Sequence, residues 1–316
     1  MAEELMGVIL AAGKGTRMRP FSEHWPKPIL PVLGKPLMAY QLEMLASMGI
    51  KSVVVVIGHL GHEVVRALGD GSAWGVEIAY VEQEETLGIA HAVSRLEPHV
   101  NRPFFLFLGD IYFATENLGS MRDRFHSEGV DGVLACKREP NLEAIKRNFV
   151  VITGPDGFVH RVIEKPRHPR TDLKGCGIYL FDLSFFDAVR RTPRTAMRNE
   201  YEITDSIQIF LDDGYKVQAA EVVKADMNVS YPADLLELNL LLLQQSGKPE
   251  FRGKDVRLGK GAELTRCVAM DGAHVGDGAK LYECLLFPGA RVPAGRVRHR
   301  TIFTADAEIR CGGDEA

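Results

Sequence analysis

Short apolar segments alternate with amphipathic ones in the first 110 residues, and this alternation limits the folds open to the chain. The apolar runs are 7–12 (GVILAA), 52–58 (SVVVVIG), 76–81 (VEIAYV) and 103–109 (PFFLFLG). Such runs are typical of strands inside a parallel sheet, because helices cover both faces of that sheet. We therefore expect an α/β fold with a doubly wound, mixed and mostly parallel sheet.

Helical patterns separate these strands. In segment 34–49, Met38, Leu42, Leu45 and Met48 recur at helical spacing. Further helices are expected at 61–68, 88–96, 184–191, 203–212 and 233–245, and further strands at 131–136, 149–166 (with a turn at Asp156-Gly157), 175–183 and 215–222. The segment 233–245 is apolar over more than half of its circumference, which favours packing in a core over a subunit or interdomain interface.

The pattern changes after residues 246–255. Glycines and small residues recur at steps of roughly six, with an apolar residue soon after each, as at Leu264, Val275, Leu281 and Val292. Hexapeptide periodicity of this kind predicts a short left-handed parallel β-helix. We expect a first domain at 1–246 and a β-helix domain at 253–316, with the boundary near 247–254.

Composition excludes several classes of protein. The net charge of −4 gives no reason to expect nucleic acid or an anionic membrane as a partner. The five cysteines are scattered and lack CxxC spacing, so disulfides and zinc sites are not expected. The apolar N-terminal stretch is too short to span a membrane and lacks the basic residues of a signal peptide. We expect a cytoplasmic protein.

The loop after the first apolar run favours an anionic ligand. It carries Gly13 and Gly15 with the cations Lys14, Arg17, Arg19 and Lys27. Met18 occupies the place of the third glycine of a dinucleotide-binding loop, and the Walker A pattern is absent as well. Prolines at 20, 26, 28 and 31 disfavour a helix directly after the glycines. A long loop at the carboxyl end of a strand lies where open α/β sheets bind ligands, so we expect it to bind a polyphosphate.

Asp110 ends another apolar strand and should lie at the same edge of the sheet. A carboxylate facing phosphates would repel them unless a divalent cation lies between, so Asp110 is a candidate ligand of Mg²⁺. Two histidines, His59 and His62, are expected to be solvated in a loop.

These motifs together carry a family resemblance. LAAGKGTRMRP (10–20), PKP (26–28) and GKP (34–36) resemble the signature of the sugar-1-phosphate nucleotidyltransferase superfamily, which includes glucose-1-phosphate thymidylyltransferases and N-acetylglucosamine-1-phosphate uridyltransferases. The likeness continues through segments 83–93 (QEETLGIAHAV), 108–110 (LGD), 164–166 (EKP), 177–181 (GIYLF), 200–205 (EYEITD) and 227–239 (MNVSYPADLLELN). It covers nearly all of the first 245 residues.

The resemblance implies a role for each matching residue. The base and ribose would contact Leu10, Ala11, Ala12 and Gly13, and the edge of the base would contact Gln83 and Gly88. The β- and γ-phosphates would bind to Gly15, Thr16 and Arg17, and the α-phosphate to Lys27. The sugar phosphate would bind to Gly109, Glu164, Lys165 and Gly177. Arg17, Lys27 and Asp110 would be catalytic. Mg²⁺ would bind Asp110 and a second ligand, with Asn228 favoured and Asp226 the close alternative.

The implied reaction is attack of a hexose 1-phosphate on the α-phosphorus of a nucleoside triphosphate. The nucleophile is already an anion, so no general base is needed, and Cys176 is not expected to be a nucleophile. Ile89, Phe149 and Gly175 depart from common relatives, which have threonine, glycine and asparagine there. Ile89 favours a pyrimidine, thymidine or uridine, and the other two leave the sugar open.

Two alternatives remain open at this stage. One is a non-catalytic regulatory subunit that binds nucleotide sugars, and the other is a bifunctional enzyme with acetyltransferase activity in the repeat segment. The enzyme is favoured over the regulatory subunit because the chain has the residues that the reaction would need, Arg17, Lys27, Asp110 and Lys165. A structural, oligomerising or regulatory role is favoured for the repeats, and a homo-oligomer is expected.

Overall fold

The structure is a computed structural model that describes residues 5–127, 129–196 and 199–312. The chain divides into two compact units. The first comprises Met1–Lys14 and Met38–Asp226, and the second comprises Gly15–Leu37 and Met227–Ala316. The chain therefore leaves the first unit within the predicted phosphate loop and returns to it at the start of the first long helix.

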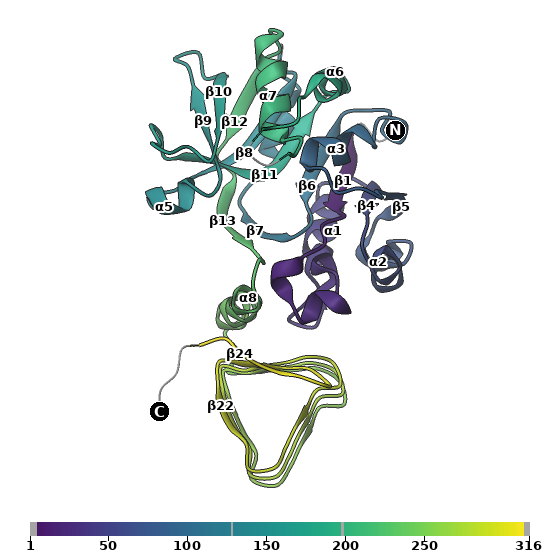
Figure 1. Cartoon of the computed structure of the whole chain (residues 1–316), viewed down its shortest axis with the longest axis vertical. Coiled ribbons are helices and arrows are strands. Elements are labelled where there is room, and N and C mark those ends of the chain that lie inside the picture. The colour runs from purple at the N-terminus through teal and green to yellow at the C-terminus, as the bar shows by residue number, and fades with distance from the viewer. Residues whose placement is uncertain (1–4, 128, 197–198, 313–316) are drawn as a thin grey trace. The chain divides into compact units, whose positions relative to one another are not determined.

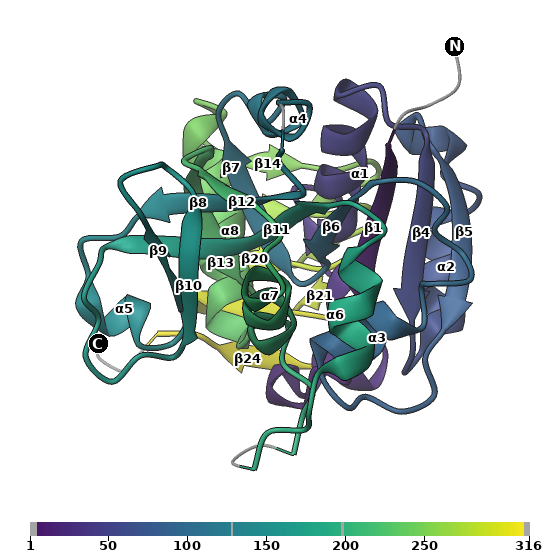
Figure 2. The same cartoon turned by 90° about the horizontal axis from the view of Figure 1, so that it is seen from above.

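A nine-stranded mixed sheet forms the centre of the first unit, with the strand order β10-β9-β11-β6-β1-β4-β5 along its main path. The neighbours β6, β1, β4 and β5 run parallel, whereas β11 is antiparallel to β6, β8 and β9. Figure 2 shows β1, β4 and β5 side by side at one end of this sheet. The strands are β1 (Met6–Ala11), β4 (Ser52–Ile57), β5 (Glu77–Glu82), β6 (Phe104–Leu108), β8 (Gly132–Arg138), β9 (Phe149–Thr153), β10 (Val159–Glu164), β11 (Leu173–Phe181) and β12 (Val217–Ala220).

Helices cover both faces of the sheet. A side chain at Gly7 of β1 would lie 2.7 Å from Leu45 of the first helix, so that helix packs closely on one face. On the other face, Val8 of β1 belongs to a buried cluster with Val93 and Phe210 of two later helices. The helices of this unit are α1 (Leu37–Ser47), α2 (Gly61–Leu68), α3 (Ile89–Ser94), α4 (Ser120–Phe125), α5 (Leu142–Ile145), α6 (Phe185–Arg191) and α7 (Ile203–Asp212), with a 3-10 turn, η4, at Ser72–Trp74.

The expected strand at 76–81 forms as β5, but the prediction that it is apolar on both faces was wrong. β5 is the edge strand of the sheet, and Glu77, Ala79 and Glu82 are exposed. The short elements that were not predicted include the helices α4 and α5 and the strand β7 (Ile111–Thr115), which pairs with β13 (Val223–Asn228). No described helix has the length and apolar character needed to cross a membrane.

The second unit contains helix α8 (Pro232–Gln245), whose leucines are largely buried as the core interpretation of this segment predicted. It also contains 3-10 turns η1 (Thr16–Met18), η2 (Phe21–Glu23) and η3 (Lys27–Ile29) and the hairpin of β2 (Pro31–Val32) and β3 (Lys35–Pro36). The repeat segment follows. Its strands are β14 (Phe251–Arg252), β15 (Arg257–Leu258), β16 (Glu263–Thr265), β17 (Val268–Ala269), β18 (His274–Val275), β19 (Lys280–Tyr282), β20 (Leu285–Leu286), β21 (Arg291–Val292), β22 (Val297–His299), β23 (Thr301–Phe303) and β24 (Glu308–Arg310).

These short strands form three sheets of parallel neighbours, β14-β17-β20-β23, β15-β18-β21 and β16-β19-β22. Successive coils are 17 residues apart, as in the hydrogen bond from the Lys254 backbone N–H to Asp271 Oδ1. In Figure 1 the strands follow a triangular outline. The arrangement is consistent with the β-helix that the hexapeptide pattern predicts. The predicted domain boundary near 247–254 stays a prediction.

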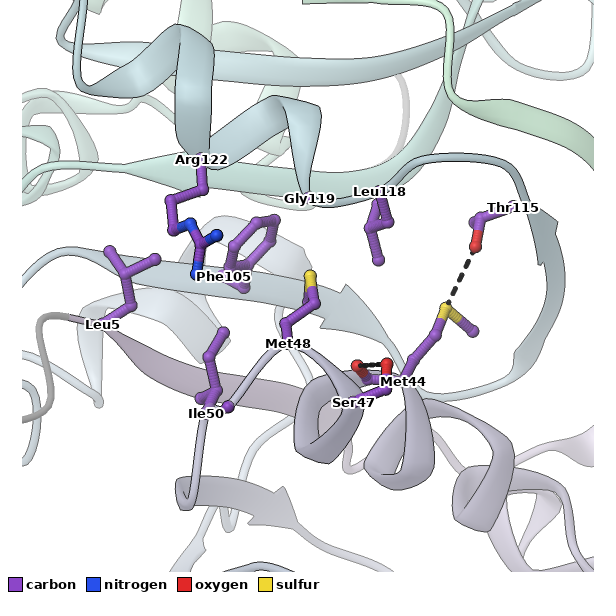
Figure 3. Close-up of a pocket in the computed structure, with 11 residues that line it drawn as sticks. Leu5, Met44, Ser47, Met48, Ile50, Phe105, Thr115, Leu118, Gly119 and Arg122 are labelled. Atoms are coloured by element: carbon purple, nitrogen blue, oxygen red, sulfur yellow. Dashed lines mark hydrogen bonds between the residues drawn. The ribbon is translucent and has the colours of Figure 1, made fainter.

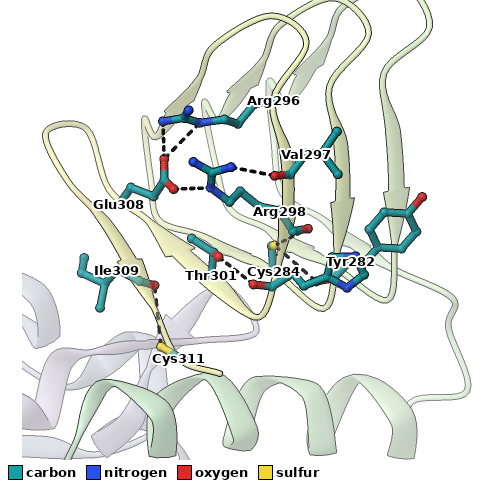
Figure 4. A network of polar contacts seen from close by, with 10 residues as sticks. Tyr282, Cys284, Arg296, Val297, Arg298, Thr301, Glu308, Ile309 and Cys311 are labelled. Carbon is teal, nitrogen blue, oxygen red and sulfur yellow. Dashed lines mark hydrogen bonds and ion pairs between the residues drawn. The ribbon is translucent and has the colours of Figure 1, made fainter. Parts of the chain in front are cut away.

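The last coil ends in a strand of opposite direction. β24 pairs antiparallel with β23 and so covers the edge of the first of these sheets. Glu308 of β24 accepts hydrogen bonds from Arg296 at 2.8 Å and from Arg298 (Figure 4). Burial would raise the pKa of Glu308, but these two guanidinium groups hold it below its ordinary value. The carboxylate is therefore ionised at neutral pH and fastens the terminal strand.

Candidate active site

The carboxyl ends of the parallel strands bring several of the predicted residues together in the first unit. The backbone N–H of Gly109, after β6, donates to the carbonyl of Leu10 at 2.9 Å. Gly58, after β4, lies so close to the chain after β1 that a side chain there would meet the Ala12 carbonyl oxygen at 2.7 Å. At Gly13, by contrast, a side chain would meet no described protein atom within 4 Å. The edge of the sheet is therefore tightly packed up to Ala12 and open at Gly13.

A cavity of about 310 Å³ opens at this edge. Its lining includes Lys14, His59 and Gln83, together with Glu82, Glu84, Thr86 and Gly58. Gln83 is buried, and its backbone N–H donates to the carbonyl of Ile57 at 2.8 Å, which extends the pairing of β4 and β5. The predicted base-reading glutamine thus lies in the wall of a cavity that Lys14 also lines.

His91 fixes the side chain of Gln83. Nδ1 of His91 lies 2.8 Å from Nε2 of Gln83, and the imidazole also hydrogen-bonds the backbone of Glu85. Burial, and after it the charge of Arg95, lower the pKa of His91, so the ring is neutral at pH 7. A neutral ring has one N–H, which the Glu85 backbone takes, so Nδ1 accepts from the Gln83 amide. The amide oxygen of Gln83 is then the atom that can meet a ligand.

Tyr201 supports both His91 and the predicted base-binding Gly88. Its ring stacks on His91 at 6.1 Å between centroids, and its backbone N–H donates to the carbonyl of Leu87 at 2.7 Å. A side chain at Gly88 would lie 2.5 Å from the Tyr201 carbonyl oxygen, and Gly88 has a φ of 113°. Only glycine fits there. Neither His91 nor Tyr201 was predicted, because nothing in the local pattern distinguishes them from core residues.

Asp110 and Gly177 both lie near residues at the end of β6. Gly177 lies within β11 with a φ of 66°, and a side chain there would lie 3.0 Å from Leu108. Gln41 of α1 donates its amide N–H groups to the carbonyls of Leu108 and Ile111, both at 2.8 Å. These bonds hold the turn that carries Asp110 from both sides.

Glu164 and Lys165 lie at the end of β10. Lys165 has a φ of 43°, and its backbone N–H donates to the carbonyl of Asn148 at 2.7 Å. Its ammonium group lies 3.3 Å from Glu164 Oε1. Phe149 is the direct partner of Glu164 on β9. Its buried ring stacks on Tyr179 with 6.2 Å between the centroids.

The two departures at Phe149 and Gly175 compensate for each other. A Cβ at Gly175 would lie only 1.9 Å from Phe149 Cζ. The ring therefore fills the space that a side chain at Gly175 would need. Asparagine at this position, which common relatives have, is incompatible with Phe149 in its observed place.

Gly175→Ala should consequently destabilise the protein by about 1–3 kcal/mol, because the methyl group overpacks a filled core. Urea unfolding of the variant measures this. Gly119→Ala is the matched control, since Gly119 has helical φ and ψ and open space around it. In a Phe149→Ala background the same change at Gly175 should cost much less. An equal cost in both backgrounds would contradict the packing argument.

Asp226 lies in a buried cluster of charges. Lys137 and Lys174 are direct partners on β8 and β11. Asp226 Oδ1 lies 2.9 Å from the Lys137 ammonium group, and Oδ2 lies 2.6 Å from that of Lys174. Glu139 also binds Lys137, at 2.9 Å. Each carboxylate oxygen of Asp226 therefore lies within ion-pair distance of a lysine ammonium group.

Cys176 adjoins this cluster on β11. Burial, and after it the charge of Asp226, raise the pKa of its thiol to about 12. The thiol stays protonated at neutral pH, which agrees with the expectation that it is not a nucleophile.

The second unit carries the remaining predicted residues. Gly15 has a φ of 60°, and a side chain there would lie 3.0 Å from Lys27 Cγ, so the stem of the buried Lys27 packs beneath it. Thr16 and Arg17 are exposed in the turn that follows. The Arg17 guanidinium lies over the ring of Tyr231, 5.5 Å from its centroid.

Asn228 lies shortly before the start of helix α8, as Tyr231 does. Its Oδ1 accepts a hydrogen bond from Ser230 Oγ at 3.2 Å, and Asn228 is otherwise exposed. Asp234 caps α8 by accepting from the backbone N–H groups of Ser230 and Tyr231 at 2.9 and 2.7 Å. This cap fixes the backbone before α8, which carries Asn228 and Tyr231. Tyr231 is the residue whose ring lies beneath the Arg17 guanidinium.

A larger cavity of about 550 Å³ in the first unit contains none of the predicted site residues. Its lining includes Met44 of α1, Met48 just after that helix, Phe105 of β6 and Arg122 of α4 (Figure 3). Leu5 stands before β1, so this cavity includes the amino end of that strand rather than its carboxyl end.

Comparisons with known proteins show the family of the chain. The family model described as nucleotidyl transferase matches residues 6–245. A glucose-1-phosphate thymidylyltransferase of Streptomyces antibioticus is 32% identical over 280 residues, covering 83% of this chain and 75% of that protein. The UTP–glucose-1-phosphate uridylyltransferase AglF of Haloferax volcanii is 33% identical over 242 residues, covering 77% and 98%.

A solved structure supports the fold. A crystal structure from Bacillus anthracis, described as a candidate glucose-1-phosphate thymidylyltransferase in complex with sucrose, superimposes with a TM-score of 0.66. It is 26% identical in sequence, and the superposition covers 75% of this chain and 94% of that one. The chain belongs to the nucleotidyl transferase family, within the superfamily of sugar-1-phosphate nucleotidyltransferases with a Rossmann-like fold.

Proposed function

We propose that the protein forms a nucleoside diphosphate sugar and pyrophosphate from a pyrimidine nucleoside triphosphate, dTTP or UTP, and a hexose 1-phosphate. The observation that carries this proposal is the cavity at the carboxyl edge of β1, β4 and β5, with Gln83 in its wall and Lys14 at its rim. Ligands of open α/β sheets bind at this edge. The names of the two relatives, which act with thymidylyl and uridylyl groups on glucose 1-phosphate, support the same class of substrates.

The orientation of Gln83 supports a uracil or thymine base. With its Nε2 donated to His91, the amide offers Oε1 as an acceptor. Uracil and thymine carry an N–H at ring position 3, and guanine carries one at ring position 1. The corresponding ring nitrogens of cytosine and adenine carry no hydrogen, so an acceptor at Gln83 disfavours these two bases. A buried acceptor left unpaired by the wrong base would lower affinity substantially.

Arg17 and Lys27 are proposed to bind the triphosphate, and Lys165 and Glu164 the sugar phosphate and sugar hydroxyls. Bringing two polyanions together requires cations placed before the substrates arrive, and Arg17 is held in advance by Tyr231. Because the sugar phosphate is already ionised, none of these side chains has to remove a proton.

The donor set of this chain fits Mg²⁺. Asp110 and Asn228 offer the hard oxygen atoms that Mg²⁺ prefers, and the ion usually takes its remaining ligands from substrate phosphates and water. Among the described residues, no three His, Cys, Asp or Glu side chains form a cluster that would hold a metal unaided. When bound, Mg²⁺ would supply charge that offsets the repulsion between the reacting phosphates. We assign Asn228 rather than Asp226 as the second ligand because two lysines hold Asp226.

The repeat segment is proposed to be a short left-handed β-helix with a structural role. Its coils present small residues at the corners and bury Val275, Leu281 and Val292 inside. This apolar interior supports a role of the segment as a scaffold.

Pyrophosphate release tests the proposal. Purified protein with Mg²⁺ is assayed with ATP, GTP, CTP, UTP and dTTP, each against glucose-, galactose-, mannose- and N-acetylglucosamine-1-phosphate. We expect turnover with UTP or dTTP and at least tenfold less with CTP, about 1.4 kcal/mol for one unpaired acceptor. Turnover with CTP alone would remove the base assignment. Nucleotide binding without turnover in any pair would favour the regulatory alternative.

A further inference from the structure

The loop that carries Gly15, Thr16, Arg17 and Lys27 is built into the second unit, where it packs on the repeat segment. Phe21 stacks on Phe287 with 5.0 Å between centroids and 18° between the ring planes. Trp25 meets the same ring edge-on, with a centroid distance of 5.7 Å and an angle of 81°. Phe287 stands at the corner that follows β20, and both it and Phe21 are at most 2% exposed.

The loop is anchored at two further places in the same unit. A side chain at Gly34 would lie 2.9 Å from Phe251 of β14, so the end of the loop touches the first coil. Asn239 of α8 accepts a hydrogen bond from the Leu33 backbone N–H at 2.9 Å and donates to the Pro31 carbonyl at 3.2 Å. Arg300, in the last coil, bonds Glu237 of α8.

These contacts divide the loop into a buried side and an exposed side. Met18, Phe21 and Leu30 are buried, whereas Thr16 and Arg17 stay exposed. The turn that carries Arg17 has no side-chain cap of its own. Its position therefore depends on how the buried side is packed, and Phe287 provides a closely stacked aromatic surface for that side.

We propose that the repeat segment positions the triphosphate-binding loop, and that Phe287 is the positioning residue through which it acts. This inference rests on the proposed function for the role of the loop. It gives the C-terminal segment a part in the reaction that needs no second active site. A loop displaced by 1 Å costs an enzyme up to about a hundredfold in rate, so loss of the Phe287 ring should be visible in kinetics.

The test compares Phe287→Ala with Phe303→Ala. Phe303 is a ring of equal size and similar burial, but it belongs to the interior cluster of the coils. Both variants should lose stability by a similar amount. Well below either melting temperature, only Phe287→Ala should raise the KM for the nucleoside triphosphate, by about tenfold or more. Equal KM values for Phe287→Ala and the wild type, or equal increases in both variants, would overturn the proposal.

A double variant tests whether Phe287 acts through Phe21. If it does, Phe21→Ala and Phe287→Ala should not add: the double variant should have about the KM of the more impaired single variant. Additive effects would show that the two rings act independently and would overturn this step.

Fluorescence separates failure of this inference from failure of the proposed function. Trp25 and Trp74 are the two tryptophans of the chain, so Trp74→Phe leaves Trp25 as the reporter on the loop. Phe287→Ala should shift the Trp25 emission to the red, and Phe303→Ala should not. A shift in a protein that turns over no substrate pair would reject the proposed function and keep the anchoring. Absence of a shift would reject the anchoring.

Discussion

Arg17→Ala should lower kcat for pyrophosphate release by about 10²–10³-fold while leaving the melting temperature unchanged. The guanidinium is exposed, so its removal opens no cavity. In the proposed reaction it faces charge that builds on the departing pyrophosphate, and removing one such preplaced donor typically costs this much. Tyr231 holds the group with a cation–π contact of about 0.5–1 kcal/mol, which keeps it in place before substrate binds.

Arg19→Ala is the matched control for Arg17→Ala. Arg19 lies in the same loop and is equally cationic, but its Nε lies 3.9 Å from Glu23 and both side chains are largely exposed. Its removal should change kcat little. Steady-state kinetics on the best substrate pair decide the matter. Comparable losses in the two variants would mean that only the net charge of the loop matters, and wild-type kcat in Arg17→Ala would remove Arg17 from the mechanism.

The strands and most helices of the first unit could be predicted because their signals are local. An apolar run such as 52–58 contains the information for a buried strand, and α2 and α7 begin and end at the predicted residues. The edge position of β5 could not be predicted in this way. It depends on whether another strand pairs beyond it, which the sequence of β5 does not contain.

Candidate site residues could be named from the sequence where a motif occupies one stretch of chain, as at Leu10–Lys27 and Asp110, and their roles stay predictions. The residues that hold those motifs could not be named in this way. Phe21 and Phe287 are far apart in sequence, and neither differs locally from an ordinary core phenylalanine. His91 gains its role only through the Gln83 amide, 2.8 Å away. Sequence patterns therefore point to candidate binding residues more readily than to the residues that pack around them.

The burial of the charged residue Lys174 is a further feature that the local sequence does not predict. In the sequence Lys174 ends a stretch, 161–174, that contains several basic residues, yet it is buried in β11. Its burial is tolerated because β8 places Lys137 opposite it and β13 brings Asp226 between the two ammonium groups. Three strands from distant parts of the sequence are needed to form this cluster.

Asp226→Asn should therefore destabilise the protein by about 3–5 kcal/mol, because it leaves buried ammonium groups without their shared carboxylate. Burial opposes the charge on Lys137, but hydrogen bonds from it to Asp226 and Glu139 raise its pKa above the ordinary value. A raised lysine pKa stabilises the folded state at neutral pH, and this contribution is lost only as the pH rises through the folded-state value. Urea unfolding at pH 7 should show the full cost.

Two comparisons make the Asp226 result decisive. Glu116→Gln removes a carboxylate from an exposed pair with Lys224 and should cost less than about 1 kcal/mol. The triple variant Lys137→Met, Lys174→Met, Asp226→Leu should regain much of the stability, since apolar side chains can replace a buried ionic cluster. If Asp226 were instead a metal ligand, Asp226→Asn would unfold like the wild type and would need more Mg²⁺ for half-maximal turnover. That outcome would favour Asp226 as a metal ligand. It would also mean that the burial of Lys137 and Lys174 does not depend on the Asp226 carboxylate.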